Sequence, residues 1–267
     1  DDMLKSLFND DKGKFIKSVL IPSNERATLC FSSQVGCKMQ CLFFMTRKQG
    51  CSANLTSNEI LYQIQAFPES SRLTNLVFMG MGEPFDNTDE LLKVLDILTA
   101  DYGYGWSPKR ITVSTIGLIK GLHRFLDESS CHLAISLHSP FPEERLTLMP
   151  IEKVYPMTEV IRLIRQYDFE HQRRVSFEYI MFEGINDSVQ HAKALAALLK
   201  GISCRVNLIR YHAIPDVPFQ PAKLHVMELF CQTLNRKGIT CTIRTSRGED
   251  IMAACGMLST MKSKGKD

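Results

Sequence analysis

The sequence lacks any hydrophobic run long enough to cross a membrane. Its 267 residues are 44% hydrophobic and 23% charged, with a single Trp, and no run approaches the roughly 18–20 apolar residues that span a bilayer. No basic stretch followed by an apolar one opens the chain, so no secretory signal is visible. A formal net charge of +3 is too small to indicate a nucleic-acid partner by itself. These features exclude collagen-like, coiled-coil and disordered classes and predict a globular cytoplasmic protein.

The cysteines lack the even framework of a disulfide-stabilised domain. There are nine, and Cys30, Cys37, Cys41 and Cys51 crowd into one early stretch. Because disulfide scaffolds belong to small secreted chains, we interpret this cluster as intracellular metal, redox or thiolate chemistry. Four others are expected to pack in the core: Cys131, Cys204, Cys231 and Cys241.

Short β-branched runs alternate with helical periodicity along most of the chain. Strands are predicted over residues 27–31, 76–79, 111–114, 133–137, 175–180, 206–209 and 239–243. Between them, apolar residues recur three and four apart, which indicates helices. Ser57 is predicted to precede the first of these helices by one residue and Ser188 to open another, and Gly201 and Gly238 are predicted to follow the ends of two. This alternation predicts one parallel α/β domain, either an incomplete (β/α) barrel or an open doubly wound sheet.

Polar residues gather where the predicted strands end. In parallel α/β folds, the loops at the carboxyl ends of the strands build the functional site. One mouth would therefore receive thiols, a carboxylate, hydroxyls and two imidazoles, which predicts an enzyme. In strand order, these residues are Cys37 and Cys41, Gly80 to Pro84, Ser114 and Thr115, Ser136 to His138, Glu178 to Glu183, and Tyr211 and His212.

Two loop motifs carry most of the predicted chemistry. Cys37 and Cys41 form a CxxxC pair, which is short of the four ligands of a structural zinc site and the three thiolates of an open iron–sulfur cluster. The plainer alternative is a chance pair of buried cysteines. The run from Gly80 to Phe85 lacks the last glycine of a dinucleotide fingerprint, and Pro84 removes an amide donor. It either presents a carboxylate to a cationic group or simply links a strand to a helix.

Cys255 lies in a stretch of small residues near the end of the chain. A lone cysteine is more often a packing residue than a nucleophile. Basic pairs at 47–48, 109–110 and 173–174 are predicted to be solvated surface, whereas Arg244 and Arg247 are predicted to contact phosphate.

Taken together, these stretches resemble the radical-SAM adenine methyltransferases of ribosomal and transfer RNA (the RlmN/Cfr group). The resemblance runs from about residue 17 to 260 and implies a partial (β/α)6 radical-SAM barrel with parallel strands. It divides the chain into an accessory N-terminal segment (1–26), a core domain (27–258) and a basic tail (259–267), with most of the family's N-terminal domain missing. The motifs that carry it are Arg26 to Cys30, Ser32 to Cys37, Gly80 to Pro84, Ala134 to His138, Val206 to Ile209, and Arg247 to Gly256.

The resemblance implies a 4Fe-4S cluster and S-adenosylmethionine as cofactors, with Cys37 and Cys41 as cluster ligands. It implies methylation of carbon 2 of an adenine in 23S rRNA, and in tRNA, through a methylated Cys255. Cys30 would then release the adduct by forming a disulfide with Cys255. A one-electron reductant such as flavodoxin is the expected protein partner, with no membrane involved. The residues expected to hold S-adenosylmethionine are Gly82, Glu83, Ser114, Ser136, Leu137, His138 and His212, the last standing where the family more often has Asn.

One departure from the family pattern is serious. The third cluster ligand belongs three residues after Cys41, where this chain has Phe44, and Arg47 and Cys51 also depart from the usual residues. Three explanations stay open. The chain is a silent homologue that binds RNA or S-adenosylmethionine, or this loop has been changed or contains a sequence error. The third explanation, which we rank last, is that Cys51 serves as the missing ligand. The sister methylation at carbon 8 of adenine also stays open, because the motifs do not separate it from carbon 2.

Overall fold

The computed structural model describes residues 4–9, 15–23, 26–45, 50–169, 173–214 and 216–244. Within them, the main sheet has nine strands in the order β1-β2-β3-β6-β7-β8-β9-β10-β11, and β4 and β5 form a separate pair. The strands are β1 (Leu4–Asn9), β2 (Phe15–Ser23), β3 (Arg26–Cys30), β4 (Gln34–Gly36), β5 (Cys51–Asn54), β6 (Asn75–Phe78), β7 (Ile111–Thr115), β8 (His132–Ser136), β9 (Val175–Met181), β10 (Cys204–Arg210) and β11 (Thr240–Ile243).

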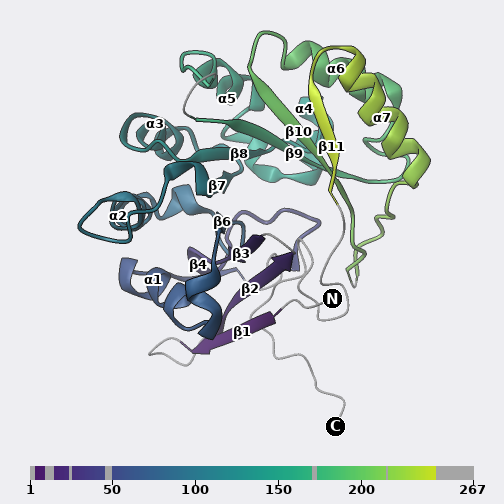
Figure 1. The fold of residues 1–267 in the computed structure, drawn as a ribbon. Coiled ribbons are helices and arrows are strands. Elements are labelled where there is room, and N and C mark those ends of the chain that lie inside the picture. The colour runs from purple at the N-terminus through teal and green to yellow at the C-terminus, as the bar shows by residue number, and fades with distance from the viewer. Residues whose placement is uncertain are drawn as a thin grey trace.

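In the main sheet, helical crossovers connect β3, β6, β7, β8, β9, β10 and β11, and these strands all run parallel. The sheet curls into a half-barrel with the crossover helices along its outer side (Figure 1). The predicted partial (β/α)6 barrel is therefore confirmed. The α-helices are α1 (Ser57–Gln65), α2 (Thr88–Thr99), α3 (Ile119–Glu128), α4 (Pro142–Leu148), α5 (Met157–Ile164), α6 (Val189–Leu198) and α7 (Leu224–Arg236). Short 3-10 turns are η2 (Pro68–Arg72), η3 (Pro84–Asp86), η4 (Pro108–Arg110) and η5 (Pro150–Lys153).

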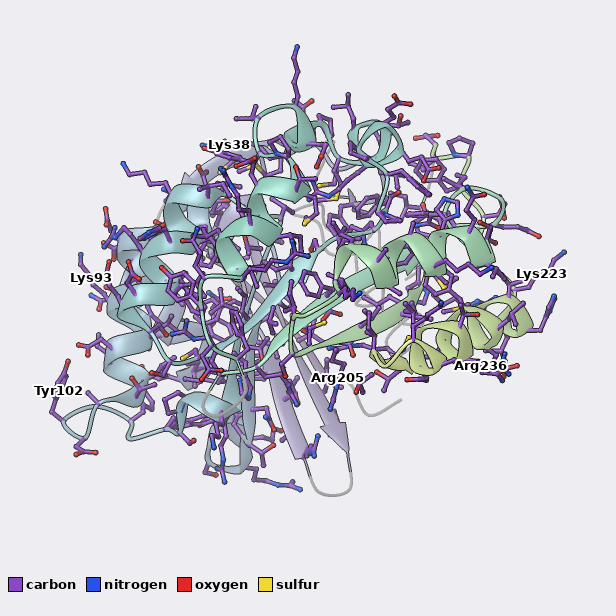
Figure 2. The ribbon with its side chains drawn as sticks, turned by 90° about the horizontal axis from the view of Figure 1, so that it is seen from above. Lys38, Lys93, Tyr102, Arg205, Lys223 and Arg236 are labelled. Carbon is purple, nitrogen blue, oxygen red and sulfur yellow. The ribbon has the colours of Figure 1, made fainter. Side chains whose placement is uncertain are left out.

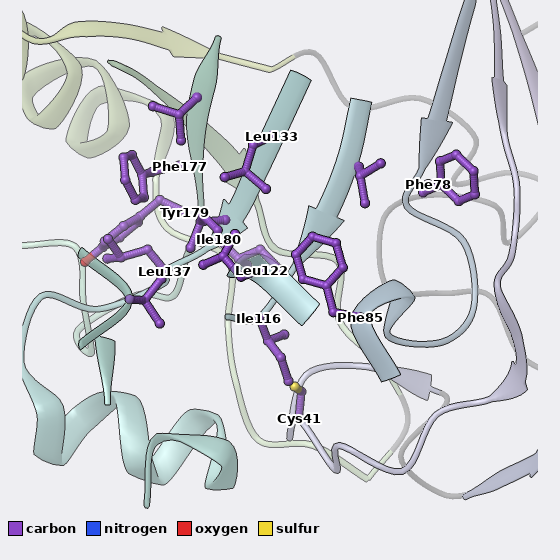
Figure 3. Packing of buried hydrophobic residues seen from close by; sticks show 14 of the residues in the cluster. Cys41, Phe78, Phe85, Ile116, Leu122, Leu133, Leu137, Phe177, Tyr179 and Ile180 are labelled. Atoms are coloured by element: carbon purple, nitrogen blue, oxygen red, sulfur yellow. The ribbon is translucent and has the colours of Figure 1, made fainter. Parts of the chain in front are cut away.

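The two faces of the parallel sheet differ in chemistry because side chains alternate along each strand. The face under the helices is apolar and fully buried, as Figure 3 shows for Leu133, Phe177 and Leu122 of α3. The opposite face lines the inside of the half-barrel, and we call it the lumen face. On β7 and β8 it carries Thr112 and His132, which are paired in register and half-buried. The hydrophobic effect thus holds the outer layer together, while the lumen face is left to polar groups.

The N-terminal segment extends the main sheet. Strands β1 and β2 pair antiparallel, and β2 pairs antiparallel with β3, so the accessory segment expected over 1–26 joins the edge of the half-barrel. In the part of the chain that the structure describes, no helix is long and apolar enough to cross a membrane.

The predicted helix boundaries are only partly right. Ser57 does not cap α1; the cap is Thr56, whose side chain accepts from the Glu59 backbone N–H while the Glu59 carboxylate accepts from the Thr56 N–H. Ser188 caps α6 as predicted. Gly201 and Gly238 follow the ends of α6 and α7 with φ of +82° and +81°. The four cysteines assigned to packing do contact the core, with Cys131 and Cys241 buried and the other two half-buried.

Candidate active site

The cysteine loop follows β3 and β4 and lies against the carboxyl ends of the neighbouring strands. Cys41 is 4% exposed and Cys37 is half-buried. Burial raises the pKa of the Cys37 thiol to about 12 and moves the pKa of Cys41 in the same direction. Both thiols are therefore protonated at neutral pH in this structure.

Phe44 occupies the position where a third thiol was expected. Its half-buried ring packs on the core and meets the ring of Phe43 edge-on, with centroids 4.6 Å apart. The Phe43 ring in turn lies 4.9 Å from the ring of His138. Aromatic packing, with no ligating atom, therefore fills this part of the loop.

Cys51 lies closer to Cys37 than the sequence suggested. Strand β5 pairs with β4 so that Cys51 stands opposite Gly36, and the Cys37 N–H donates to the Gly50 carbonyl at 2.9 Å. A side chain on Gly36 would collide with that carbonyl, since a Cβ would lie 2.0 Å from the oxygen. Even so, among the described residues no three His, Cys, Asp or Glu side chains form a group that could hold a metal ion. The proximity therefore does not complete a ligand set.

Glu83 links the ends of two strands below this loop. Its carboxylate is 3% exposed and accepts hydrogen bonds from the Thr115 hydroxyl at 2.5 Å, the Ile116 N–H at 3.0 Å and the Phe85 N–H at 3.1 Å. Burial raises the pKa of Glu83 to about 7, although these hydrogen bonds act in the opposite direction. The carboxyl group can therefore hold or release a proton near neutral pH.

Gly82 brings the Glu83 loop against β4. Its φ is +101°, and a Cβ there would lie 2.6 Å from Gln34, so a larger residue would displace that side chain. The Gln34 side chain accepts from the Glu83 N–H at 2.9 Å and donates to Asn54 at 2.7 Å and to Asp86 at 2.8 Å. Sequence reasoning missed Gln34, because nothing local distinguishes a buried glutamine that joins three segments.

His138 presents a buried donor with no partner. Its φ is +59°, and its Nδ1 accepts from the Ile180 N–H at 3.0 Å, so the proton is on Nε2. That Nε2 has no hydrogen-bond partner among the described residues. Burial, followed by the charge of Arg145, lowers the pKa of His138 to about 3. The ring is therefore neutral and offers one N–H to a polar ligand.

Arg145 is a second residue that sequence reasoning missed. Its side chain is fully buried in α4, pairs with Glu152, and donates to the carbonyls of Ile116 at 3.0 Å, Ser136 at 3.2 Å and Leu137 at 3.1 Å. It thereby holds the ends of β7 and β8 in place. In sequence it looks like one more charge in a helix, and only its contacts reveal the role.

The remaining predicted residues fall into two groups. Cys30 and Ser114 lie half-buried on the lumen face of β3 and β7, and His212 is half-buried just after β10. Cys255, Arg247 and Arg47 lie outside the described residues. The structure thus gathers Cys37, Cys41, Glu83 and Ser136 to His138 at one end of the half-barrel, as expected for the carboxyl ends of parallel strands.

This half-barrel, with thiols after its first parallel strand, is the architecture of a radical SAM protein. The family model of the Radical SAM superfamily matches residues 31–196. A crystal structure of a radical SAM methyltransferase from Sphaerobacter thermophilus superposes with a TM-score of 0.93 at 41% identity, covering 97% of this chain and 78% of that one.

Curated relatives narrow the class. "Probable dual-specificity RNA methyltransferase RlmN" of Parabacteroides distasonis is 67% identical over 98% of this chain and 77% of its own length. "Dual-specificity RNA methyltransferase RlmN" of Syntrophus aciditrophicus is 42% identical over 97% of this chain and 76% of its own length. The chain belongs to the RlmN family of radical SAM RNA methyltransferases.

Membership of this family implies a 4Fe-4S cluster and S-adenosylmethionine as cofactors. The residues present fit S-adenosylmethionine better than they fit the cluster. The unpartnered Nε2–H of His138 suits a polar ligand such as S-adenosylmethionine. The cluster fits poorly, because Cys37 and Cys41 supply two thiolates, Phe44 supplies none, and the described residues form no group of three.

Proposed function

We propose that the site of this chain is built to methylate carbon 2 of an adenine in 23S rRNA and in tRNA, and that Phe44 withholds the third thiolate which this reaction requires. The family is that of RNA methyltransferases, and the dual specificity in the names of its relatives supports two RNA substrates. The observation that carries the proposal is the identity of 67% over nearly the whole chain, together with Cys30, which packs against the cluster of Val19 and Met81, the residue before Gly82.

Two thiols would act on the methyl group. The Cys255 thiolate would attack the methyl carbon of S-adenosylmethionine, forming an S–CH3 bond while the sulfonium bond breaks and S-adenosylhomocysteine leaves. Cys30 would later release the RNA: its thiolate would attack the Cys255 sulfur, forming the S–S bond while the bond from that sulfur to the carbon on adenine breaks, and that carbon would take a proton to become the methyl group. The seven residues predicted to hold the cofactor keep that role here, with His138 offering its free N–H. A one-electron reductant such as flavodoxin is the partner that the family reaction would require.

A second candidate rests on Phe44. Because Cys37 and Cys41 are the only family cluster ligands present, the radical step is not part of the chemistry that the described residues provide. The chain would then bind RNA or S-adenosylmethionine without methylating carbon 2.

Nucleoside analysis separates these candidates. The unmodified chain and its Phe44→Cys variant are expressed in cells lacking their own enzyme, and 23S rRNA and tRNA are digested and examined by mass spectrometry. We expect 2-methyladenosine with Phe44→Cys and none when Cys255→Ala is added. Product from the unmodified chain would eliminate the silent candidate. Product at carbon 8, or no product from Phe44→Cys, would refute the proposed reaction.

A further inference from the structure

Three arginines form a rim around the lumen at the amino ends of the strands. Arg26 begins β3, Arg174 immediately precedes β9, and Arg205 is the second residue of β10. We call these three residues the arginine rim. In Figure 2, Arg205 lies at the opposite end of the sheet from Lys38 of the cysteine loop. The rim is therefore separate from the site of the predicted cofactors.

Strand register places these side chains on the lumen face. Arg205 pairs with Ser176, two residues after Arg174, so both arginines share one face of the sheet. The Arg174 N–H donates to His132 Nδ1 at 3.0 Å, which ties it to the lumen residue at the start of β8. Side chains alternate along β3 in the same way, so Arg26 lies on the same face of the strand as Cys30, four residues later.

The rim has no direct ion pair within the described part of the chain, and Glu178 is the carboxylate that acts electrostatically on Arg174. None of its three arginines makes an ion pair there, and Arg205 Nε is buried without a hydrogen-bond partner. The nearby carboxylate is Glu178, which lies 3.5 Å from Arg244 and accepts from Asn207 at 2.7 Å and Ser176 at 3.0 Å. These contacts all fall on Glu178 Oε1, while its Oε2 is buried without a hydrogen-bond partner among the described residues.

The positive charges of the rim affect the pKa values of Arg174, itself a rim residue, and of the neighbouring His132. The pKa of Arg174 is lowered by burial and then by Arg205, Arg244 and Arg26, while Glu178 acts in the opposite direction. The pKa of His132 is lowered to about 4 by burial and then by Arg174, with smaller effects of other basic groups. Repulsion among like charges raises the free energy of the folded chain, and a bound anion would relieve it.

We propose that the arginine rim binds backbone phosphates of the RNA substrate, an inference that rests on the proposed RNA-directed function. Guanidinium groups match phosphate oxygens with paired hydrogen bonds, and several converging on one opening fix the path of a nucleic-acid strand. The lumen beyond the rim carries further hydrogen-bonding groups, such as Ser176 and Asn207. The rim thus positions RNA at one end of the half-barrel, while the cysteine loop lies at the other. Of the pair Arg173–Arg174, expected to be solvated surface, Arg174 is exposed as expected, whereas Arg173 is half-buried and packs on Phe125.

The test compares rim variants with a matched arginine outside the lumen. Arg174→Gln, Arg205→Gln and the double variant each remove charge from the rim. Arg236→Gln removes one exposed charge from the end of α7, on the outer layer in Figure 2. Binding of a fluorescent tRNA transcript is followed by anisotropy over a series of KCl concentrations, and thermal melting of each variant is recorded.

We expect the double variant to raise Kd by on the order of tenfold and each rim substitution to lower the salt slope by roughly 0.7–1. Arg236→Gln should leave Kd and slope nearly unchanged. Melting temperatures of the rim variants distinguish a lost phosphate contact from loss of the fold. A rim variant that binds like the unmodified chain would overturn the inference and leave the proposed function standing.

Competition for the bound transcript shows which kind of anion the rim binds. If the unmodified chain binds no RNA, the RNA-directed function itself fails, and the inference fails with it. If inorganic pyrophosphate or polyglutamate displaces the transcript as well as unlabelled RNA does at equal charge, the rim is a general anion site, and its assignment to RNA is wrong. Displacement by RNA alone supports the assignment.

Discussion

Replacing Phe44 by cysteine tests whether one side chain decides cofactor binding. The variant restores a thiol three residues after Cys41, where the family expects its third ligand. The loop backbone that would carry it already exists, and Cys37 and Cys41 are in place before the substitution. We therefore expect the variant to bind iron and the unmodified chain to bind little.

The cost to the metal-free fold follows from the packing of Phe44. Removing a fully buried phenylalanine costs about 3–5 kcal/mol, and an aromatic pair adds about 0.5–1.5 kcal/mol. Phe44 is only half-buried, and among the described residues its one ring partner is Phe43, at 4.6 Å. We expect metal-free Phe44→Cys to lose about 1–2 kcal/mol, which lowers the melting temperature by roughly 2–8 °C.

Reconstitution with iron and sulfide should offset this loss of stability. Iron and sulfide are measured per chain after anaerobic reconstitution, and melting is followed by circular dichroism before and after. We expect about four irons in the variant, with a higher melting temperature when loaded, because a group that binds only the folded state stabilises it. Leu42→Cys is the matched control, since it adds a thiol at a half-buried position of the same loop that faces no ligand vacancy in the family pattern.

Either of two results would refute this reasoning. About four irons in the unmodified chain would show that another residue replaces the missing thiolate, and Cys51, opposite Gly36, would be the first to mutate. A folded Phe44→Cys variant with no more iron than Leu42→Cys would show that the loop has lost more than one ligand.

Three further predictions test individual contacts of the site and the fold. The free energy of unfolding should fall by about 3 kcal/mol between pH 4.5 and 7, because Glu83 keeps its proton up to about pH 7 in the folded chain but releases it near pH 4.5 in the unfolded chain. Urea titrations should show a weaker dependence of this free energy on pH for Glu83→Gln, and an equally steep dependence would contradict the assignment. Arg145→Met should cost about 3–5 kcal/mol in the same assay by leaving Glu152 buried and unpaired, and adding Glu152→Leu should restore most of it; no recovery would mean that the strand-end carbonyls dominate. Thr56→Ala should cost about 1 kcal/mol and Ser57→Ala much less, and equal losses would contradict the capping assignment.

The sequence by itself determined the layered architecture. Runs such as Ile111–Thr115 and Val175–Met181 are β-branched and apolar, and the segments between them repeat at helical spacing, so each element is set by local pattern. Because parallel strands place their carboxyl ends at one edge, the same pattern predicted that the cysteine loop, Glu83 and His138 would meet. The substitution at Phe44 was also visible, since it breaks a motif of fixed spacing.

Only the tertiary structure decided which distant groups share an environment. Arg145 is an ordinary helical charge until α4 packs against the ends of β7 and β8. Cys51 approaches Cys37 because β5 pairs with β4, and Arg174 and Arg205 share a face because β9 and β10 lie in a particular register. Register depends on contacts between segments far apart in the chain, and a shift of one residue would turn each arginine to the opposite face. No local pattern contains that information.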